Sequence, residues 1–340
     1  SKENFALTFD RAAVPITSVE HYMIEEEIGY IQINRFAETT NDEFQSAIRA
    51  LKTAGMTKLI LDLRNNPGGY LEAAEAIADT FLAEGKGIVT VESNQGERET
   101  TYATADGAFE EGLVYILING ESASASEVVA GALQDNDRAW IVGQRSFGKG
   151  LVQQQMPLGQ QEAIRLTTAR YYTPTGRSIQ RPFDQGKQAY FDEVRERYHS
   201  GEMADSEKIP QNDSLAFTTP NGRTVYGGGG IVPDIYLENK ASLDEEWSNY
   251  ILRSNVINHF VFTELDKRRN EFKDVNKEAF IGQPLQDDLR WLEALENYIE
   301  TEEVPLKLED TELAKVAIQS YLGLQLFDEA TRLSILHQQN

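Results

Sequence analysis

The spacing of apolar and polar positions divides the first half of the chain into short strands and helices. A strand-like run covers 24–33. A helical pattern follows, in which Phe44, Ile48 and Leu51 share one face before the chain breaks at Gly55. Further apolar runs predict strands at 59–63, 87–91 and 113–118 and helices at 71–82 and 128–133. Repeated strand–helix–strand units of this size predict a partly parallel sheet with helices packed on it.

The pattern changes twice in the second half of the chain. Strands are predicted at 151–156 and 163–172, and the polar, acidic and weakly periodic segment 184–221 is interpreted as a mobile insertion. From residue 241 the apolar positions recur at helical spacing. They include Trp247, Tyr250, Ile251, Trp291, Leu295, Tyr298 and Ile299, followed by runs at 313–322 and 326–336. We interpret 241–340 as a helical region and a candidate oligomerisation element.

Composition removes several classes of function. A net charge of −23 and a pI near 4.6 argue against a nucleic-acid partner, because phosphate binding needs clustered Lys and Arg. The chain has no cysteine, and its four histidines lack the spacing of metal ligands, so no metal site is expected. No apolar run reaches the roughly 20 residues of a membrane-spanning helix, so neither such a helix nor a signal peptide is expected within this sequence.

One stretch imitates a phosphate-binding loop. Gly143 to Lys149 has the spacing of the Gly-x4-Gly-Lys motif, but Gly150 stands where Ser or Thr would bind magnesium. A predicted strand also follows where the motif requires a helix. Nucleotide binding is therefore not expected, and the sequence predicts no cofactor.

The candidate chemistry centres on three serines between a strand and a helix. Ser122, Ser124 and Ser126 alternate with alanines after the strand 113–118 and before the helix 128–133. A helix N-terminus there offers unpaired N–H groups and positive partial charge beside a hydroxyl. The nucleophile-elbow motif Gly-x-Ser-x-Gly is not matched. Local chemistry does not choose among the three serines, and Ser122 could equally be a helix N-cap.

A serine nucleophile needs a base, and no histidine lies near the motifs. Lys149 stands between two glycines, and burial would lower its pKa because an apolar site disfavours the ammonium form. An ordinary surface lysine in a loop is the alternative interpretation. Serine and lysine together predict a serine hydrolase with a lysine base.

A second loop could supply an oxyanion site. The turn 66–69 (Asn-Pro-Gly-Gly) directly follows the strand 59–63, as the serine turn follows the strand 113–118. Loops at the carboxyl ends of parallel strands meet at one edge of the sheet. A glycine N–H there can point at a developing negative oxygen, although such a turn is most often only a turn.

Three motifs in register closely resemble the C-terminal processing peptidases, the tail-specific Ser/Lys proteases of family S41. They are LDLRNNPGG at 61–69, SASASE at 122–127 and SFGKGLVQ at 146–153. Supporting pieces are AGALQD at 130–135, YYTPTGR at 171–177 and GIVPD at 230–234. The resemblance runs in order from about residue 14 to residue 238.

The resemblance implies an α/β fold and a set of site residues. The fold would be a crotonase/ClpP-like catalytic core with a β-rich cap, which holds substrate chains extended beside a strand. Ser124 would be the nucleophile, Lys149 the general base, and Gln153 the residue that orients the lysine. The oxyanion hole would combine the N–H of Ala125 with that of Gly68 or Gly69.

The resemblance also implies a domain layout and a location. Family members usually carry a PDZ domain ahead of the core. This chain is expected to lack that domain, and residues 1–20 look like the connector that follows it. The core and cap would then cover 21–240 and the helical region 241–340. The overall character is similar to members from Bacteroidetes-like bacteria, which implies the periplasm or cell envelope.

The leading hypothesis is an endopeptidase that cleaves extended or unfolded proteins near their C-termini. A second hypothesis is a non-catalytic scaffold that binds peptides on the same fold. A pure binder has no need of a buried amine beside a hydroxyl, which favours the enzyme. A third hypothesis is an enzyme that hydrolyses a non-peptide acyl substrate.

Overall fold

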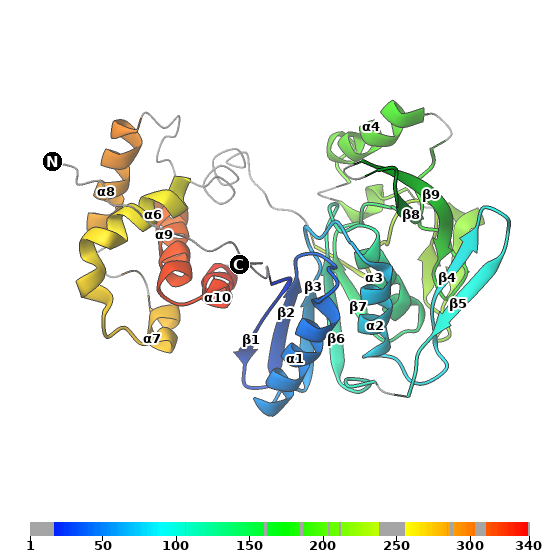
Figure 1. Cartoon of the computed structure of the whole chain (residues 1–340), viewed down its shortest axis with the longest axis horizontal. Coiled ribbons are helices and arrows are strands. Elements are labelled where there is room, and N and C mark those ends of the chain that lie inside the picture. The colour runs from blue at the N-terminus through cyan, green and yellow to red at the C-terminus, as the bar shows by residue number, and fades with distance from the viewer. Residues whose placement is uncertain are drawn as a thin grey trace.

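The computed structural model describes residues 17–105, 107–159, 162–183, 186–202, 205–210, 212–237, 256–283, 285, 288–302 and 311–338. Most of the predicted connector and the apolar set around Trp247 lie outside the described residues. Figure 1 shows two sheets with their helices on one side and the helices α6 to α10 on the other.

A six-stranded sheet forms the base of the first half. Its strand order is β1-β2-β3-β6-β7-β12, in which only β1 runs antiparallel to its neighbour. The strands are β1 (Val19–Glu25), β2 (Ile28–Ile33), β3 (Lys58–Asp62), β6 (Leu113–Ile118), β7 (Trp140–Gly143) and β12 (Ile235–Tyr236). The prediction of a single strand over 24–33 is wrong, because the chain turns at Glu26–Glu27 and forms the hairpin β1–β2.

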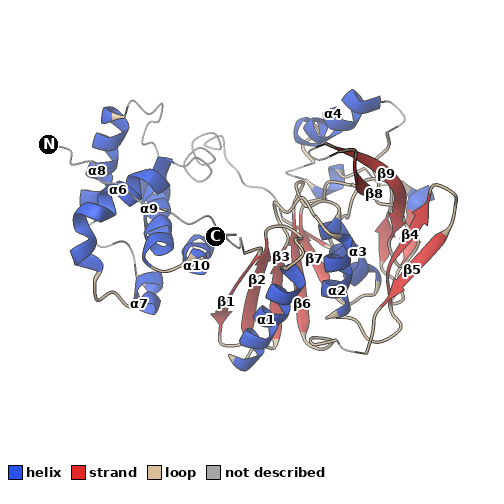
Figure 2. Cartoon of the chain, viewed as in Figure 1, coloured by secondary structure: helices blue, strands red, loops and turns tan. Residues whose placement is uncertain are grey.

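Three helices follow the strands of this sheet, as the periodicity predicts. They are α1 (Thr40–Thr53), α2 (Leu71–Asp79) and α3 (Ala125–Asp135). The predicted face of α1 is buried, with Phe44 and Ile48 fully enclosed. Figure 2 shows α2 and α3 between the two sheets, and both contact β4 of the second sheet. The helix that begins after the serine turn therefore lies inside the core.

The second sheet is antiparallel, with strand order β5-β4-β9-β8. Its strands are β4 (Gly87–Ser93), β5 (Arg98–Tyr102), β8 (Leu151–Pro157) and β9 (Ala163–Tyr172). β5 is absent from the predicted strands, because its sequence is polar and carries no apolar alternation. β8 lies at the edge of this sheet, and its pairing with β9 shifts register between Val152 and Gln153, where Thr168 of β9 is the extra residue.

The segment predicted as an insertion contains a helix and short elements. These are α4 (Gly186–His199), η1 (Ser206–Lys208), η2 (Asp213–Leu215) and β10 (Ala216–Thr218), and β10 pairs with β11 (Thr224–Tyr226). Glu193 of α4 forms ion pairs with Arg145, Arg181 and Arg197, so α4 is tied to the core. The mobility of 184–221 stays a prediction.

The helices after residue 255 pack around a core of their own. They are α6 (Val256–Arg268), η3 (Arg269–Phe272), α7 (Lys277–Gly282), α8 (Asp288–Thr301), α9 (Thr311–Leu326) and α10 (Glu329–His337). Trp291, Leu295 and Phe260 are buried in this second cluster. α10 contacts β1, where His337 Nδ1 lies 2.5 Å from the hydroxyl of Tyr22.

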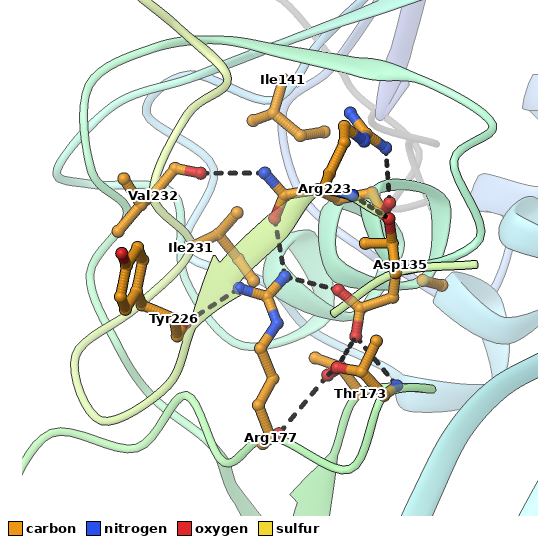
Figure 3. Close-up of polar contacts among 12 residues, drawn as sticks. Asp135, Ile141, Thr173, Arg177, Arg223, Tyr226, Ile231 and Val232 are labelled. Carbon is orange, nitrogen blue, oxygen red and sulfur yellow. Dashed lines mark hydrogen bonds and ion pairs between the residues drawn. The ribbon is translucent and has the colours of Figure 1, made fainter. Parts of the chain in front are cut away.

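A buried ion pair holds the C-terminal end of α3 (Figure 3). Arg177 donates to Asp135 Oδ1 at 2.7 Å and to the carbonyl of Tyr226 at 2.9 Å. Asp135 Oδ2 accepts from the N–H and the hydroxyl of Thr175. The side chains of Arg177 and Asp135 have 0% exposed surface, so water cannot solvate either charge if the other is removed.

Removing Arg177 should therefore destabilise the whole fold. We expect Arg177→Ala to lower the free energy of unfolding by about 3–5 kcal/mol, because it leaves Asp135 as an uncompensated buried charge. Urea denaturation measures the change. The matched control is Lys58→Ala, which breaks the exposed pair with Glu27 and should cost less than about 1 kcal/mol. Equal losses in the two variants would contradict this role for the buried pair.

Candidate active site

Hydrogen bonds separate the three serines that the sequence leaves equivalent. Ser122 Oγ donates to the carbonyl of Leu63 at 2.8 Å, and Ser126 Oγ donates to the carbonyl of Asn66 at 3.0 Å. Both side chains are fully buried and fasten the serine turn to the neighbouring loop. Ser124 is partly exposed and is the one of the three that lines a cleft.

Ser124 stands on a strained turn immediately before α3. Its φ of 56° and ψ of −115° lie outside the regions that a residue with a side chain normally adopts. Such strain persists only where surrounding contacts fix the backbone, and it is concentrated at functional sites. The turn places Ser124 directly before Ala125, whose N–H is the one in the first turn of the helix without an acceptor among the described residues.

The carboxylate of Glu127 fixes this turn against the lysine loop. Oε2 accepts from the N–H groups of Ser124 and Lys149, both at 2.9 Å. Oε1 accepts from the N–H of Gly148 at 2.7 Å and from the hydroxyl of Ser146 at 2.5 Å. Burial raises the pKa of Glu127, and the four hydrogen bonds oppose that rise. Since three of the four donors are backbone N–H groups, the arrangement requires an accepting carboxylate.

Tyr171 of β9 makes a second link between the same two residues. Its hydroxyl lies 3.0 Å from the carbonyl oxygen of Ser124 and 2.7 Å from that of Lys149. The side chain is buried, and burial raises the pKa of its phenol well above the usual value. Tyr171 therefore stays a neutral donor. The serine turn and the lysine loop are held together on two sides.

Lys149 is half-buried and faces the same cleft as Ser124. Burial lowers the pKa of its amine, the nearby positive charge of Arg165 lowers it further, and Glu127 acts in the opposite direction. A lowered pKa increases the fraction of neutral amine that can accept a proton. No hydrogen bond joins Lys149 Nζ to Ser124 Oγ in this structure.

The cleft has a volume of about 660 Å³ and lies between two parts of the chain. One wall is the segment 67–72, which runs from the glycine turn into the first residues of α2, and the other is the edge strand β8. All six residues named from the sequence line it: Gly68, Gly69, Ser124, Ala125, Lys149 and Gln153. Gln153 is exposed and makes no hydrogen bond to Lys149, so nothing in the structure tests its orienting role.

The glycine turn packs directly on the serine turn. A Cβ on Gly68, where φ is +95°, would lie 2.7 Å from Ser124 Cβ and 2.9 Å from the nitrogen of Ala125, so only glycine fits. Gly69 is held equally close, because a Cβ there would lie 2.0 Å from the carbonyl oxygen of Phe36. The backbone of the turn can therefore approach a reacting group beside Ser124.

The N–H groups of this region differ in what they are free to bind. The N–H of Gly68 already donates to Asn66 Oδ1 at 2.9 Å. Those of Gly69 and Ala125 have no acceptor among the residues that the structure describes. The geometry therefore favours Gly69 over Gly68 as the partner of Ala125 for a negative oxygen.

Sequence reasoning gave no role to Glu127, Tyr171 or Asn66. A signal for Glu127 was present, because Ser124 and Glu127 have the Ser-x-x-Glu spacing of a capping box. In a capping box the side chain of the third helical residue accepts a hydrogen bond from the N–H of the N-cap residue. The bond from the Ser124 N–H to the Glu127 carboxylate is this interaction. No local signal marks Tyr171, since its contacts depend on how β9 packs against α3.

The described residues contain no group of three His, Cys, Asp or Glu side chains placed to hold a metal ion. Within the same residues, no helix combines the length and apolar character needed to cross a membrane.

Part of the chain matches a known protein family. Residues 27–185 match the sequence profile of peptidase family S41, and this part of the chain belongs to that family. The match includes the glycine turn, the serine turn and the lysine loop, and it ends before α4.

Similar proteins include C-terminal processing proteases. A carboxy-terminal-processing protease of Bartonella bacilliformis is 46% identical over 163 residues, which are 47% of this chain and 38% of that protein. The carboxy-terminal processing protease CtpA of Bacillus subtilis is 33% identical over 218 residues, which are 61% of this chain and 46% of that protein. The chain thus spans less than half the length of these relatives.

A solved structure with a related sequence is that of a photosystem II D1 C-terminal processing protease. Its sequence identity is 27% and its TM-score 0.48, over 68% of this chain and 52% of that one.

Glu127→Gln tests whether the carboxylate positions the site. In glutamine an NH₂ group replaces one of the two carboxylate oxygens, and this group cannot accept a hydrogen bond. Two of the four donors would therefore lose their acceptor. We expect the rate at which a fluorophosphonate labels Ser124 to fall by about 100-fold, the scale of a 1 Å misplacement.

The matched control is Glu121→Gln, an exposed glutamate on the same turn, which should label at the unchanged rate. Thermal melting of both variants establishes that they are folded at the assay temperature. Unchanged labelling of a folded Glu127→Gln variant would show that the carboxylate does not set the geometry.

Proposed function

We propose that the chain is a serine endopeptidase that cleaves extended or unfolded proteins near their C-termini. One observation carries the proposal: of three neighbouring serines only Ser124 reaches the cleft, and Glu127 fastens its turn to that of Lys149. The family of residues 27–185 and the names of the relatives support a protease acting at C-termini.

In the proposed mechanism the neutral amine of Lys149 takes the proton from Ser124 Oγ as the oxygen attacks the substrate carbonyl. The carbonyl oxygen becomes negative and accepts from the N–H groups of Ala125 and Gly69. The lysine then returns its proton to the leaving amine, and an acyl-enzyme remains on Ser124. Water, deprotonated by the same amine, releases the acid product.

Three further features belong to this proposal. A rotation of the half-buried Lys149 side chain would bring its amine to Ser124, as catalytic hydrogen bonds often tighten only with substrate present. Gln153 would orient that amine. A substrate would lie extended along the edge strand β8, which lines the cleft, with main-chain bonds giving loose sequence preference.

The finer fold and context are proposed on resemblance. The α/β core would be of the crotonase/ClpP type with the antiparallel sheet as its cap. The C-terminal helices would serve assembly into a homo-oligomer, and the location would be the periplasm or cell envelope.

Substitution of the two reacting groups tests the mechanism. Ser124→Ala and Lys149→Ala should each lower the cleavage rate of unfolded casein by at least about 1,000-fold, because neither attack nor proton transfer can proceed. Lys86→Ala, an exposed lysine outside the cleft, should be unaffected. Near-full activity in Lys149→Ala would refute the lysine base. Binding of casein without any cleavage by the unaltered chain would favour a peptide-binding scaffold.

The pH profile gives an independent test. The base must be neutral, so kcat/KM should rise as pH increases through the pKa of Lys149. Arg165 lowers that pKa, hence Arg165→Gln should raise it and move the acid limb of the profile to higher pH. The control Arg49→Gln changes an exposed arginine on α1 and should leave the profile in place. A shift of the Arg165→Gln limb to lower pH would contradict the assignment.

A further inference from the structure

A second hollow lies beside the catalytic cleft. It has a volume of about 970 Å³ and shares Lys149, Leu151 and Gln153 with the cleft. The two spaces therefore meet at the proposed base. Neither the motifs nor the proposed mechanism gives this second space a role.

The hollow lies on one face of the β8–β9 pair. The strand register sets Leu151 opposite Arg170 and Gln153 opposite Thr167, which places these four side chains on the same face. Its other wall comes from the segment after β9 and from Tyr190 of α4. A chain that passes Ser124 along the edge of β8 would reach this face within a few residues.

The charge of the hollow is opposite to that of the protein. The chain carries a net charge of −23, yet none of the described residues that line the hollow is acidic. Arg170 is exposed and makes no ion pair among the described residues. The acid opposite it in the register, Glu92 of β4, is instead paired with Arg98. The guanidinium of Arg170 is therefore available to form an ion pair with a negative group on a bound molecule.

A buried cluster beneath the hollow adds positive charge. The guanidinium of Arg181 lies 4.1 Å from the ring centres of both Phe147 and Tyr190, and its ion pair with Glu193 measures 2.7 Å. Its Nε and Nη2 are buried and have no hydrogen-bond partner among the described residues. Arg145, Arg181 and Arg197 share two carboxylates, those of Glu193 and Glu202, so one positive charge is in excess.

We propose that this hollow is a substrate subsite for a carboxylate, with Arg170 as the residue that selects it. The proposal rests on the proposed peptidase function and names part of its substrate specificity. A guanidinium can bind a carboxylate through two parallel hydrogen bonds, whereas a neutral amide offers no charge to pair. The aromatic rings of Phe147, Phe183 and Tyr190 would cover the apolar part of the same substrate residue.

The carboxylate has two sources in a protein substrate: an acidic side chain near the cleaved bond, or the free C-terminus of a short tail. Both present the same group to Arg170. The first predicts a preference for Glu over Gln at one position. The second predicts a preference for a free C-terminal acid over its amide.

Two sets of fluorogenic peptides test the subsite with the full chain. The first set exchanges Glu for Gln at each position near the cleaved bond, and the second exchanges the C-terminal acid for the amide. We expect the unaltered protein to prefer the carboxylate at one position by about two- to fivefold in kcat/KM, the range of a partly exposed charge pair. Arg170→Gln should reduce that ratio to about one, and Arg170→Lys should keep part of it.

The preference is the ratio of two kcat/KM values measured with the same variant, so it does not depend on the amount of active enzyme. Arg49→Gln, which removes an exposed charge on α1, should keep the full preference. A protein that shows no carboxylate preference in either set, or keeps its preference in Arg170→Gln, overturns the proposal.

Binding separates this proposal from the peptidase mechanism. Ser124→Ala should bind the preferred carboxylate peptide more tightly than its neutral partner in fluorescence anisotropy, and adding Arg170→Gln should remove the difference. A preference in binding without any cleavage by the unaltered protein would sustain the subsite while refuting the peptidase. Cleavage without any preference would do the reverse.

Discussion

The site depends on one buried carboxylate. Glu127 lies in the first turn of α3. Its carboxylate accepts hydrogen bonds from Ser124, before that helix, and from the loop Gly148–Lys149 that leads into β8. Removing a carboxylate from water is costly unless its lone pairs are satisfied, and here four donors satisfy them. The same bonds therefore stabilise the buried group and set the distance between the proposed nucleophile and the proposed base. Ser124 lies on the loop after β6 of the parallel sheet, and Lys149 lies on the loop before β8 of the antiparallel sheet.

The helix α3 carries this constraint through the core. Its N-terminus is fixed by Glu127, and its C-terminus is fixed by the ion pair of Asp135 with Arg177 (Figure 3). Between these ends the helix is buried along its whole length, so the serine turn cannot move without repacking the core. The glycine turn is equally fixed, since Gly68 contacts the serine turn directly. Two loops of the parallel sheet and one strand of the antiparallel sheet thus form one preorganised cleft.

Much of this arrangement follows from the sequence. The strands 113–118 and 163–172 have the predicted bounds, because the first is an unbroken apolar run and the second is rich in β-branched and aromatic residues. The meeting of the glycine and serine turns follows from their places after parallel strands. The hairpin in 24–33 was missed because three glutamates, Glu25 to Glu27, were included in one strand. The choice of Ser124 needs coordinates, because it depends on which hydroxyls are buried by contacts with residues about 60 positions away.

The most direct measurement is a high-resolution crystal structure of the protein after reaction with a serine-directed phosphonate. The account predicts a covalent bond to Ser124 Oγ and an adduct oxygen within hydrogen-bond reach of the N–H groups of Ala125 and Gly69. Lys149 Nζ should lie beside the modified oxygen, and Glu127 should keep its four donors. An adduct on another serine, or a Lys149 amine directed away from Ser124 with the adduct in place, would contradict the account.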